Sequence, residues 1–212
     1  MVKDLYIIGA GDFGREVLAI ARDIEKTQTK WKIKGFLDSN LNALDGIETD
    51  GYNICDTVEN HNISEGCVYI CAIANVDVKK KICTSYISKG AEFINLIHPT
   101  ARVGYTSKIG IGFIAPQYSL VTENVTIGNF VTLNAFSGIG HDAVIEDFCT
   151  ISSHCDIMGH VTIKESVFLG SGAAICPGVI IGEHVRIGVG SVVLKNVKPN
   201  KTVFGNPAKE IF

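Results

Sequence analysis

The second half of the chain repeats its apolar residues with a period of six. From Ile97 to Val193, every sixth position is valine, isoleucine or leucine, with Ala115 the single departure. Small or β-branched side chains recur four residues after most of these positions, and glycine often follows the aliphatic residue directly. A period of six fits neither an α-helix, which repeats about every 3.6 residues, nor an isolated amphipathic strand, which alternates. It indicates short strands joined by tight corners, the pattern of a hexapeptide β-helix.

The first 96 residues follow a different pattern, in which short apolar strands alternate with helices. The predicted strands are Asp4–Gly9, 33–37, 67–74 and 92–97, and the predicted helices are 15–26 and 75–90. The order β-α-β…β-α-β is typical of a small parallel sheet. The predicted fold is therefore an α/β domain at 1–96, followed at 97–212 by an all-β domain, which is a parallel β-helix with a C-terminal tail.

Three glycines, Gly9, Gly11 and Gly14, form a G-x-G-x-x-G turn between the first strand and the first helix. Such a turn lets a phosphate approach backbone N–H groups at a helix N-terminus. Asp38 follows the second strand, where an acid can bind a ribose hydroxyl. A dinucleotide fold needs two such halves, so 96 residues suit a single nucleotide better than NAD. The alternative is that the glycines only pack the strand against the helix.

Composition limits the classes of function. The 212 residues are 46% hydrophobic and 19% charged, which is typical of a globular chain. The formal charge of -3 does not favour nucleic-acid binding, which needs an excess of Lys and Arg. No apolar run reaches the ~18 residues that span a bilayer, and the apolar stretch near the N-terminus is too short for a signal peptide. The 7 cysteines are odd in number and lack a C-x-x-C motif, so we expect reduced thiols and a cytoplasmic location.

Several motifs together resemble the sugar O-/N-acyltransferase family of the sialic-acid O-acetyltransferase (NeuD) and PglD type. They are IIGAGDFGREV near the start, FLDSN, NLIHPTARVG at the junction, GIGHDAVIEDF in the repeat and VFGNPAKEI at the end. The resemblance covers essentially the whole chain. It implies a Rossmann-like domain that binds a nucleotide sugar, and a left-handed β-helix with three hexapeptides per coil. It also implies acetyl-CoA as co-substrate and a homotrimer with active sites between subunits.

The resemblance assigns the general base to His141, which lies in the segment GHD. Asp142 would raise the basicity of this histidine, and Gly159 in MGHV matches the family's oxyanion glycine. The repeat adds a geometric check, because three hexapeptides per coil place residues 18 apart on neighbouring coils, where they should stack. His141 would then face Gly159, which has no side chain to block the space and whose N–H could meet a developing oxyanion. Asp142 would face His160, and these two side chains are candidates for a pair.

The resemblance also suggests binding residues, several of which depart from the family pattern. They are Gly11, Asp12, Phe13, Asp38, Ser39 and Ala74 for the nucleotide sugar, and Thr150, Gly159, Ser171 and Val189 for acetyl-CoA. Relatives often have Gly and His where this chain has Asp12 and Phe13, Gly at Ala74, and His at Thr150. A carboxylate at Asp12 would repel a pyrophosphate unless it points away from the turn or caps the helix.

The remaining histidines and the inward cysteines are expected to be structural or solvated. A zinc site, as in hexapeptide carbonic anhydrases, would need three converging histidines. His154 and His160 are one hexapeptide apart and should lie on different faces of one coil, so we expect no metal. Cys149 and Cys155 fall in the inward phase of the repeat and are predicted core residues, which argues against a cysteine nucleophile.

The favoured function is an acetyl-CoA-dependent N-acetyltransferase that acts on the amino group of a nucleotide-linked amino sugar in bacterial surface-glycan synthesis. Two alternatives stay open. One is O-acetylation of a sugar of the sialic-acid type. The other is a non-catalytic trimeric scaffold that binds a nucleotide sugar through its front domain.

Overall fold

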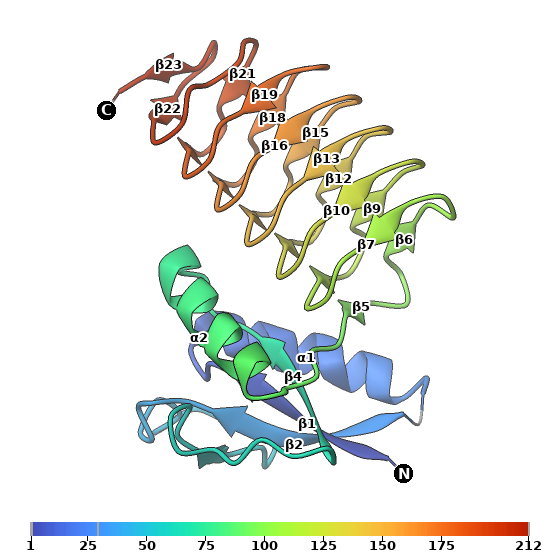
Figure 1. The fold of residues 1–212 in the computed structure, drawn as a ribbon, viewed down its shortest axis with the longest axis vertical. Helices are drawn as coiled ribbons and strands as arrows, with labels where there is room; N and C mark the ends of the chain where they lie inside the picture. Colours follow the sequence, from blue (N-terminus) through green and yellow to red (C-terminus); the bar gives the residue numbers. More distant parts are fainter. Residues whose placement is uncertain (1, 29, 212) are drawn as a thin grey trace. The chain divides into compact units, whose positions relative to one another are not determined.

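The computed structural model describes residues 2–28 and 30–211. They form two compact units, and the division falls between His98 and Pro99, two residues beyond the predicted boundary. Figure 1 shows a sheet with two helices in the first unit and a stack of coils in the second. The predicted architecture, an α/β domain followed by a parallel β-helix, is confirmed. No helix in the described part of the chain is long and apolar enough to cross a membrane.

The first unit is built on a parallel sheet of four strands in the order β3-β2-β1-β4. These strands are β1 (Lys3–Ile8), β2 (Trp31–Leu37), β3 (Ile54–Asp56) and β4 (Cys67–Cys71), and the short β5 (Leu96–Ile97) comes at the end of the unit. β4 is buried over its whole length and β1 is buried from Leu5 onward, as expected for parallel strands covered on both faces. β4 and β5 are shorter than predicted; Phe93 makes only an isolated bridge to Tyr69.

Two helices connect the strands. α1 (Asp12–Glu25) and α2 (Val76–Ser88) each bury one face. α1 begins three residues before its predicted start, because the end of the glycine turn already forms the first helical turn. The sequence pattern does not predict β3, which has only three residues. Gly35 explains how β3 approaches β2, because a Cβ at this position would lie 2.5 Å from the Asn53 carbonyl oxygen.

The second unit is a solenoid whose strands, two residues long except for the three-residue β22, form three faces. The first face contains β6 (Arg102–Val103), β9 (Leu120–Val121), β12 (Gly138–Ile139), β15 (Asp156–Ile157), β18 (Ala174–Ile175) and β21 (Val192–Val193). The second face contains β7 (Lys108–Ile109), β10 (Thr126–Ile127), β13 (Val144–Ile145), β16 (Thr162–Ile163) and β19 (Ile180–Ile181). The third face contains β8 (Ile114–Ala115), β11 (Thr132–Leu133), β14 (Thr150–Ile151), β17 (Phe168–Leu169), β20 (Arg186–Ile187) and β22 (Thr202–Phe204), with β23 (Lys209–Glu210) antiparallel to β22.

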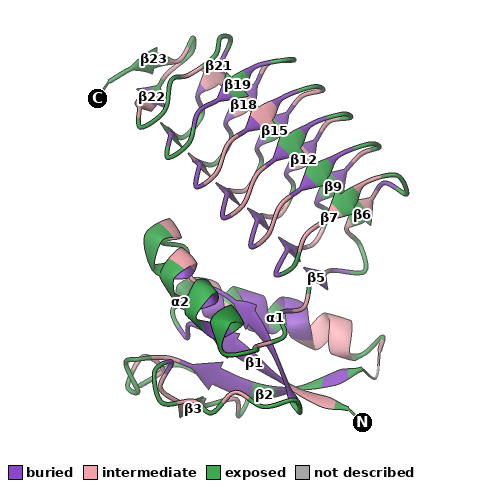
Figure 2. Cartoon of the chain, viewed as in Figure 1, coloured by how far each residue is buried: buried purple, intermediate pink, exposed green. Residues whose placement is uncertain are grey.

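The aliphatic residue of the six-residue period points into the solenoid. Ile139, Ile157 and Ile175 follow one another along the first face and are at most 1% exposed. Figure 2 shows the resulting contrast between buried and exposed positions along the coils. Cys149 and Cys155 also lie in this core, as predicted, and burial raises the pKa of the Cys155 thiol. A buried, protonated thiol is a poor nucleophile, so the core position argues against cysteine chemistry.

The corners explain why the period is six. Every sixth residue from Gly112 to Gly190 has a positive φ, and the ten residues among them that are not glycine have φ between 56° and 62°. This left-handed conformation is costly for residues with a Cβ, by roughly 1–2 kcal/mol each. Backbone hydrogen bonds between coils stabilise it; the N–H of His160, for example, donates to the His141 carbonyl oxygen over 2.9 Å. We call the corner between the first and second faces the first corner, and that between the third and first faces the third corner.

Candidate functional site

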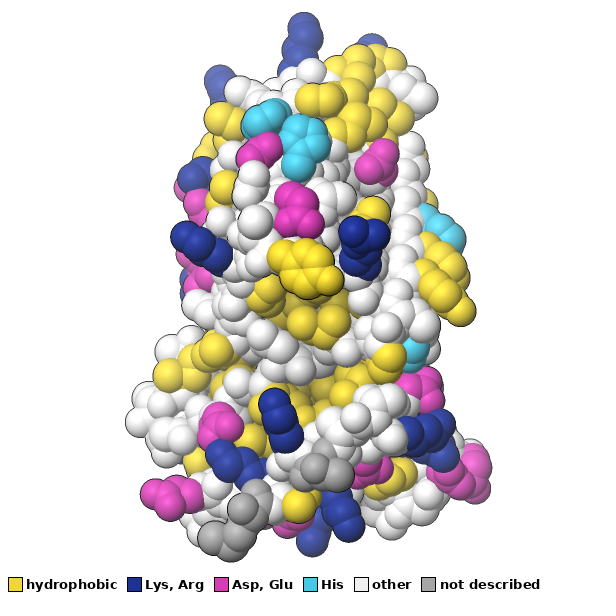
Figure 3. All heavy atoms as spheres, turned by 90° about the vertical axis from the view of Figure 1, so that its right-hand side faces the viewer, with side chains coloured by type: hydrophobic (Ala, Val, Ile, Leu, Met, Phe, Trp, Pro, Cys, Tyr) yellow, Lys and Arg dark blue, Asp and Glu magenta, His cyan; other side chains and the backbone are white. Residues whose placement is uncertain are grey.

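His141, Asp142, Gly159 and His160 lie together on the first corner. The strands that precede them, β12 and β15, pair in register, with Ile139 opposite Ile157. Residues 18 apart therefore stack, which places Gly159 next to His141 and His160 next to Asp142. Figure 3 shows histidine side chains beside an acidic side chain at the molecular surface, and the side chains of His141 and His160 are 62% and 65% exposed.

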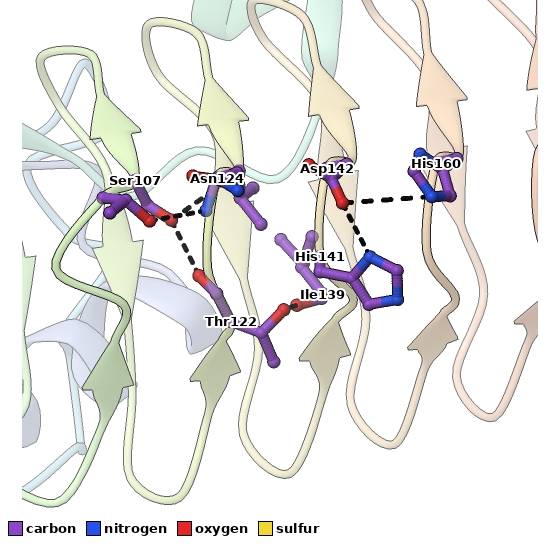
Figure 4. Close-up of polar contacts among 9 residues, drawn as sticks. Ser107, Thr122, Asn124, Ile139, His141, Asp142 and His160 are labelled. Atoms are coloured by element: carbon purple, nitrogen blue, oxygen red, sulfur yellow. Dashed lines mark hydrogen bonds and ion pairs between the residues drawn. The ribbon is translucent and has the colours of Figure 1, made fainter.

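The Asp142 carboxylate orients the His141 ring. The distance from Nδ1 of His141 to Oδ2 of Asp142 is 2.7 Å (Figure 4). This hydrogen bond, with the nearby His160 and His141 rings as smaller causes, lowers the pKa of Asp142 below its ordinary value. An ionised carboxylate only accepts hydrogen bonds, so Nδ1 must carry the proton. Nε2 of a neutral His141 then keeps its lone pair, as a general base requires.

The corner backbone holds this pair in place. Asp142 has φ 59°, and its N–H donates to the Glu123 carbonyl oxygen over 3.2 Å. Short polar side chains tolerate this left-handed conformation better than most. Glu123 and Thr106 extend the polar ladder on the same corner, because the Thr106 hydroxyl donates to Oε2 of Glu123 over 2.6 Å. The catalytic candidates are thus one segment of a continuous hydrogen-bonded corner.

Gly159 gives the His141 ring its space. A Cβ at Gly159 would lie 2.8 Å from both Cε1 and Nε2 of His141, which is closer than side chains approach one another. The absence of a side chain at Gly159 is therefore a condition for the observed ring position. Among the described residues, the N–H of Gly159 donates to no protein acceptor, so it stays available to a ligand beside Nε2.

His160 lies on the other side of Asp142. Its Nε2 is 3.9 Å from Oδ2 of Asp142, the same oxygen that accepts from His141. The two imidazole rings are perpendicular, with centroids 5.1 Å apart. Coil spacing predicts this neighbour, although the resemblance assigns it no role. His154, by contrast, lies on the third corner, where its ring stacks on Phe136 with centroids 5.1 Å apart.

The residues suggested for acetyl-CoA do not join His141 within one chain, apart from Gly159. Thr150 belongs to β14 on the third face and is only 5% exposed. Ser171 and Val189 lie 18 residues apart on the third corner, where the N–H of Gly190 donates to the Ser171 carbonyl oxygen. These residues and the catalytic candidates thus occupy different edges of the solenoid.

The structure accounts for glycine differently at the three positions of the front turn. Gly9 has φ +100°, and a Cβ at Gly14 would lie 2.1 Å from the Gly9 carbonyl oxygen, so both are needed for the turn and its packing. Gly11 has φ -68° and nothing within 4 Å of the position of a Cβ. It is also the N-cap residue of α1 and provides no side-chain cap. Packing therefore explains Gly9 and Gly14, whereas Gly11 leaves the backbone N–H groups of the helix start open to an anion.

The other suggested sugar-binding residues lie around this turn, at the carboxyl ends of β2, β1 and β4. Asp12 is on the first turn of α1 and pairs with Arg15 at 2.6 Å, so its charge is partly compensated. Asp38 accepts hydrogen bonds from the N–H groups of Ala10 and Asn40, at 2.7 and 2.9 Å, and so holds the glycine turn. The Ser39 hydroxyl donates to Glu59 over 2.8 Å. Phe13 is half-buried, and Ala74 is exposed after β4.

Two further histidines, His98 and His61, lie in the first unit. His98 is 8% exposed and its Nε2 lies 3.5 Å from Asp23. His61 shares a 3.0 Å hydrogen bond between Nε2 and the Tyr69 hydroxyl, and burial lowers its pKa. Neither contributes to the first-corner cluster, so both fit structural roles.

Comparisons with known proteins agree with this architecture. Residues 4–86 match the family model of the PglD N-terminal domain, and residues 160–195 match that of the bacterial transferase hexapeptide (six repeats). The resemblance seen in the sequence motifs is thereby confirmed. A GDP-perosamine N-acetyltransferase from Escherichia coli O157:H7 is 32% identical over 147 residues, which are 66% of this chain and 63% of that relative. The match thus spans less than two thirds of the relative's length.

Solved structures resemble the chain over nearly its whole length. The acetyltransferase domain of PglB from Neisseria gonorrhoeae FA1090 has a TM-score of 0.91 and 27% identity, and covers 99% of this chain and 100% of that domain. The same domain has been solved in complex with acetyl coenzyme A, with a TM-score of 0.91 and 26% identity over 100% of both chains. WeeI from Acinetobacter baumannii AYE has a TM-score of 0.88 and 27% identity over 99% of this chain and 100% of its own.

Proposed function

Because this chain joins a PglD N-terminal domain to bacterial transferase hexapeptide repeats, we propose that it is an acetyl-CoA-dependent N-acetyltransferase of a nucleotide-linked amino sugar. Its place would be bacterial surface-glycan synthesis. The observation that carries the proposal is the His141–Asp142 pair, with Nδ1 bonded at 2.7 Å and Nε2 free beside Gly159. Relatives named for N-acetyl transfer and for a complex with acetyl coenzyme A support the choice of reaction and co-substrate.

The mechanism is direct transfer of the acetyl group. The amine nitrogen attacks the thioester carbonyl carbon while Nε2 of His141 accepts the proton that the nitrogen loses. The N–H of Gly159 stabilises the negative charge that develops on the carbonyl oxygen. The C–S bond then breaks, coenzyme A leaves as a thiolate, and the proton on His141 neutralises it. No acyl-enzyme forms. A general base of this kind contributes about 10²–10⁴-fold to the rate.

Asp142 acts through His141. Its charge stabilises the imidazolium that forms during proton transfer, and its hydrogen bond keeps the ring in the orientation that exposes Nε2. Because both side chains are exposed, the acceptor amine can reach Nε2 from solvent without displacement of the fold. The geometry therefore favours an acceptor that arrives from outside the solenoid.

The front unit would bind the nucleotide part of the acceptor. Its open helix start at Gly11 suits a phosphate, and Asp38 and Ser39 follow the adjacent strand, where ribose contacts are usual. The pairing of Asp12 with Arg15 removes much of the repulsion that a free carboxylate would cause. This arrangement supports a nucleotide diphosphate sugar as acceptor, with Phe13 and Ala74 at its periphery.

We further propose a homotrimer, in which Thr150, Ser171 and Val189 of one subunit hold acetyl-CoA opposite His141 of another. The support is that these residues lie on different edges of a single solenoid, so one chain does not bring them together. A cyclic trimer closes such a heterologous contact. Multi-angle light scattering should give about three times the chain mass of 22.8 kDa, and a monomer or stable dimer would contradict the proposal.

The reaction is tested by incubating the protein with acetyl-CoA and UDP-, dTDP- and GDP-linked 4-amino sugars, and following the release of free thiol. N-acetyl transfer to at least one amine acceptor is expected. The corresponding 4-hydroxy sugars are the matched controls. Transfer only to hydroxyl acceptors would identify an O-acetyltransferase, and binding without thiol release would leave a nucleotide-sugar-binding scaffold.

A further inference from the structure

His141, Asp142 and His160 each place one potential metal-ligand atom within 4.8 Å of the other two. No other group of three or more histidine, cysteine or acidic ligands converges in residues 2–28 and 30–211. We propose that this first-corner cluster is a binding site for Zn²⁺ or a similar transition-metal ion, and that the ion inhibits the enzyme. The binding stands on these residues alone, whereas the inhibition rests on the proposed function.

The spacing of the ligand atoms is close to that of a zinc site. Zinc binds imidazole nitrogen and carboxylate oxygen at about 2.0–2.2 Å, so two ligands of a tetrahedral ion lie about 3.3 Å apart. Oδ2 of Asp142 is 2.7 Å from Nδ1 of His141 and 3.9 Å from Nε2 of His160. One distance is shorter and the other longer than the ideal by about 0.6 Å. All three ligands are on partly or largely exposed side chains, so side-chain rotation is the adjustment that we expect when an ion binds.

The backbone brings these ligands together before any ion binds. Asp142 and His160 both have left-handed φ, and the bond from the His160 N–H to the His141 carbonyl oxygen joins the two coils directly. Gly159 leaves the space beside His141 free. The three side chains are between 39% and 65% exposed, so an ion reaches them from solvent. The cost of ordering the site is therefore largely met by the fold.

The donor set selects the class of ion. Two imidazoles and one carboxylate suit Zn²⁺, Cu²⁺, Ni²⁺ and Co²⁺, whereas Mg²⁺ and Ca²⁺ prefer oxygen ligands. Three protein ligands leave the fourth position of a tetrahedral ion to water, so the ion can exchange. In the sequence pattern, His154 and His160 fall on different faces of one coil, so no metal is expected there. The structure instead groups His160 with the adjacent His141 and Asp142, a combination that counting histidines overlooks.

Occupation of the site removes the general base. An ion on Nδ1 of His141 replaces the proton that Asp142 accepts there, and the neutral ring then carries its proton on Nε2. Nε2 has no lone pair left to accept the proton of the acceptor amine. Acetyl transfer should therefore fall as the site fills and recover when a chelator removes the ion. The ion takes no part in the reaction; it blocks Nε2 indirectly, because a neutral ring that holds the ion on Nδ1 carries its one proton on Nε2.

The test compares His160→Asn with His154→Asn, both in the untagged full-length chain carrying Cys55→Ser. The Cys55 change removes the exposed thiol, which could bind zinc by itself. Asparagine tolerates the left-handed φ of 60–61° at both positions, and Asn124 already occupies the equivalent place on the first corner. Both variants should therefore fold, which thermal melting checks.

Zinc binding is measured by isothermal titration calorimetry, and Co²⁺ provides a visible spectrum of the same site. We expect one ion per chain, with affinity at least ~10-fold weaker in His160→Asn and unchanged in His154→Asn, as for loss of one ligand. Equal affinities in the two variants would overturn the site. So would the absence of binding at about 100 µM Zn²⁺, a concentration that suffices for a weak three-ligand site.

Activity separates this proposal from the proposed function. Each protein is assayed for thiol release with and without Zn²⁺, and inhibition is expressed as a fraction of that protein's own activity. His160-dependent zinc binding in a protein inactive towards every acceptor would uphold the site and contradict the transferase function. An active protein that Zn²⁺ saturates without inhibiting would overturn the inhibitory role. Recovery of activity with EDTA is the expected result, and Mg²⁺ at the same concentration should have no effect.

Discussion

On the first corner Asn124, Asp142 and His160 follow one another with φ of 59–61°, and on the third corner Tyr118, Phe136 and His154 do the same. The backbone is thus the same, but the side chains interact differently. Those of the first corner hydrogen-bond along and between coils, as Glu123 does with Thr106 and Asp142 with His141. Those of the third corner stack, with ring centroids 5.3 Å and 5.1 Å apart.

This difference shows how a uniform repeat produces a localised site. The rings of Tyr118, Phe136 and His154 stack on one another, so this part of the third corner stabilises the solenoid through ring contacts instead of hydrogen bonds. The hydrogen bonds of the first corner leave Nε2 of His141 free, and the lack of a side chain at Gly159 makes space beside it. Chemistry is therefore concentrated where the polar ladder meets a glycine.

Replacing His141 by Asn should lower kcat at least ~100-fold, because the general base is lost, with little change in KM for acetyl-CoA. His154→Asn, at the third corner, is the matched control and should stay within about twofold of the unchanged protein. The measurement is steady-state thiol release under saturating acceptor. Near-full activity in His141→Asn would remove the catalytic assignment of the first corner.

Replacing Gly159 by Ala should lower kcat about 10–100-fold, because the new Cβ forces the His141 ring away from its observed position. The control is Gly138→Ala on β12, because a Cβ at Gly138 would meet nothing within 4 Å. Kinetics and thermal melting are measured together. We expect the melting temperature to change by only about 2 °C in both variants. If Gly159→Ala lost stability in proportion to activity, Gly159 would be a turn residue only.

Replacing Phe136 by Ala should lower the free energy of unfolding by about 1–3 kcal/mol, because two ring stacks worth about 0.5–1.5 kcal/mol each are lost. Phe136→Gly loses the same stacks but relieves the left-handed backbone, and should recover about 1 kcal/mol relative to Ala. Urea denaturation measures both. The kcat of each variant should be unaltered, because the ring stacks of Phe136 take no part in the catalytic step. Equal stability of the Ala and Gly variants would show that backbone strain at this corner is negligible.

Replacing Thr106 by Val should raise the pKa of Glu123 towards the ordinary value of a glutamate. Hydrogen bonds from the Thr106 hydroxyl and N–H lower this pKa in the folded chain, and the variant loses the first of them. A lowered pKa favours the folded state above the unfolded pKa, and this contribution is lost as pH falls through the folded value. Carboxyl-carbon NMR titration measures the pKa directly. An unchanged Glu123 titration would show that the hydroxyl adds nothing to the ladder.

The solenoid could be predicted almost completely from sequence, and the front unit less so. The period from Ile97 to Val193 places each inward residue, because stacked coils require the same apolar side chain at the same place in every turn. In the front unit β3 was missed and the first helix began at Asp12 instead of residue 15. Short edge strands such as β3 depend on a partner distant in sequence, here β2, and carry little pattern of their own.

The candidate site was partly predictable for the same reason. Coil spacing alone predicts that His141 lies beside Gly159 and Asp142 beside His160. In the front unit, the sequence motif does not distinguish the role of Gly11 from the roles of Gly9 and Gly14, since all three belong to one motif. Only the space around each Cα showed that Gly14 is required by packing and Gly11 is not. The structure also shows that Asp38 accepts a hydrogen bond from the N–H of Ala10, an interaction that a ribose-binding pattern does not suggest.

By itself, the sequence determined the two-part architecture, the inward face of every coil and the column in which the histidine, acid and glycine lie. These features follow from periodicity, which a linear chain records directly. The folded structure adds which ring nitrogen of His141 is free, how close His160 comes to Asp142, and that Thr150 is almost completely buried on the third face. Such features depend on rotamers and on contacts between coils at distances of a few ångströms. No spacing rule resolves them, because a residue's place in the repeat fixes its neighbour but not the direction in which its polar atoms point.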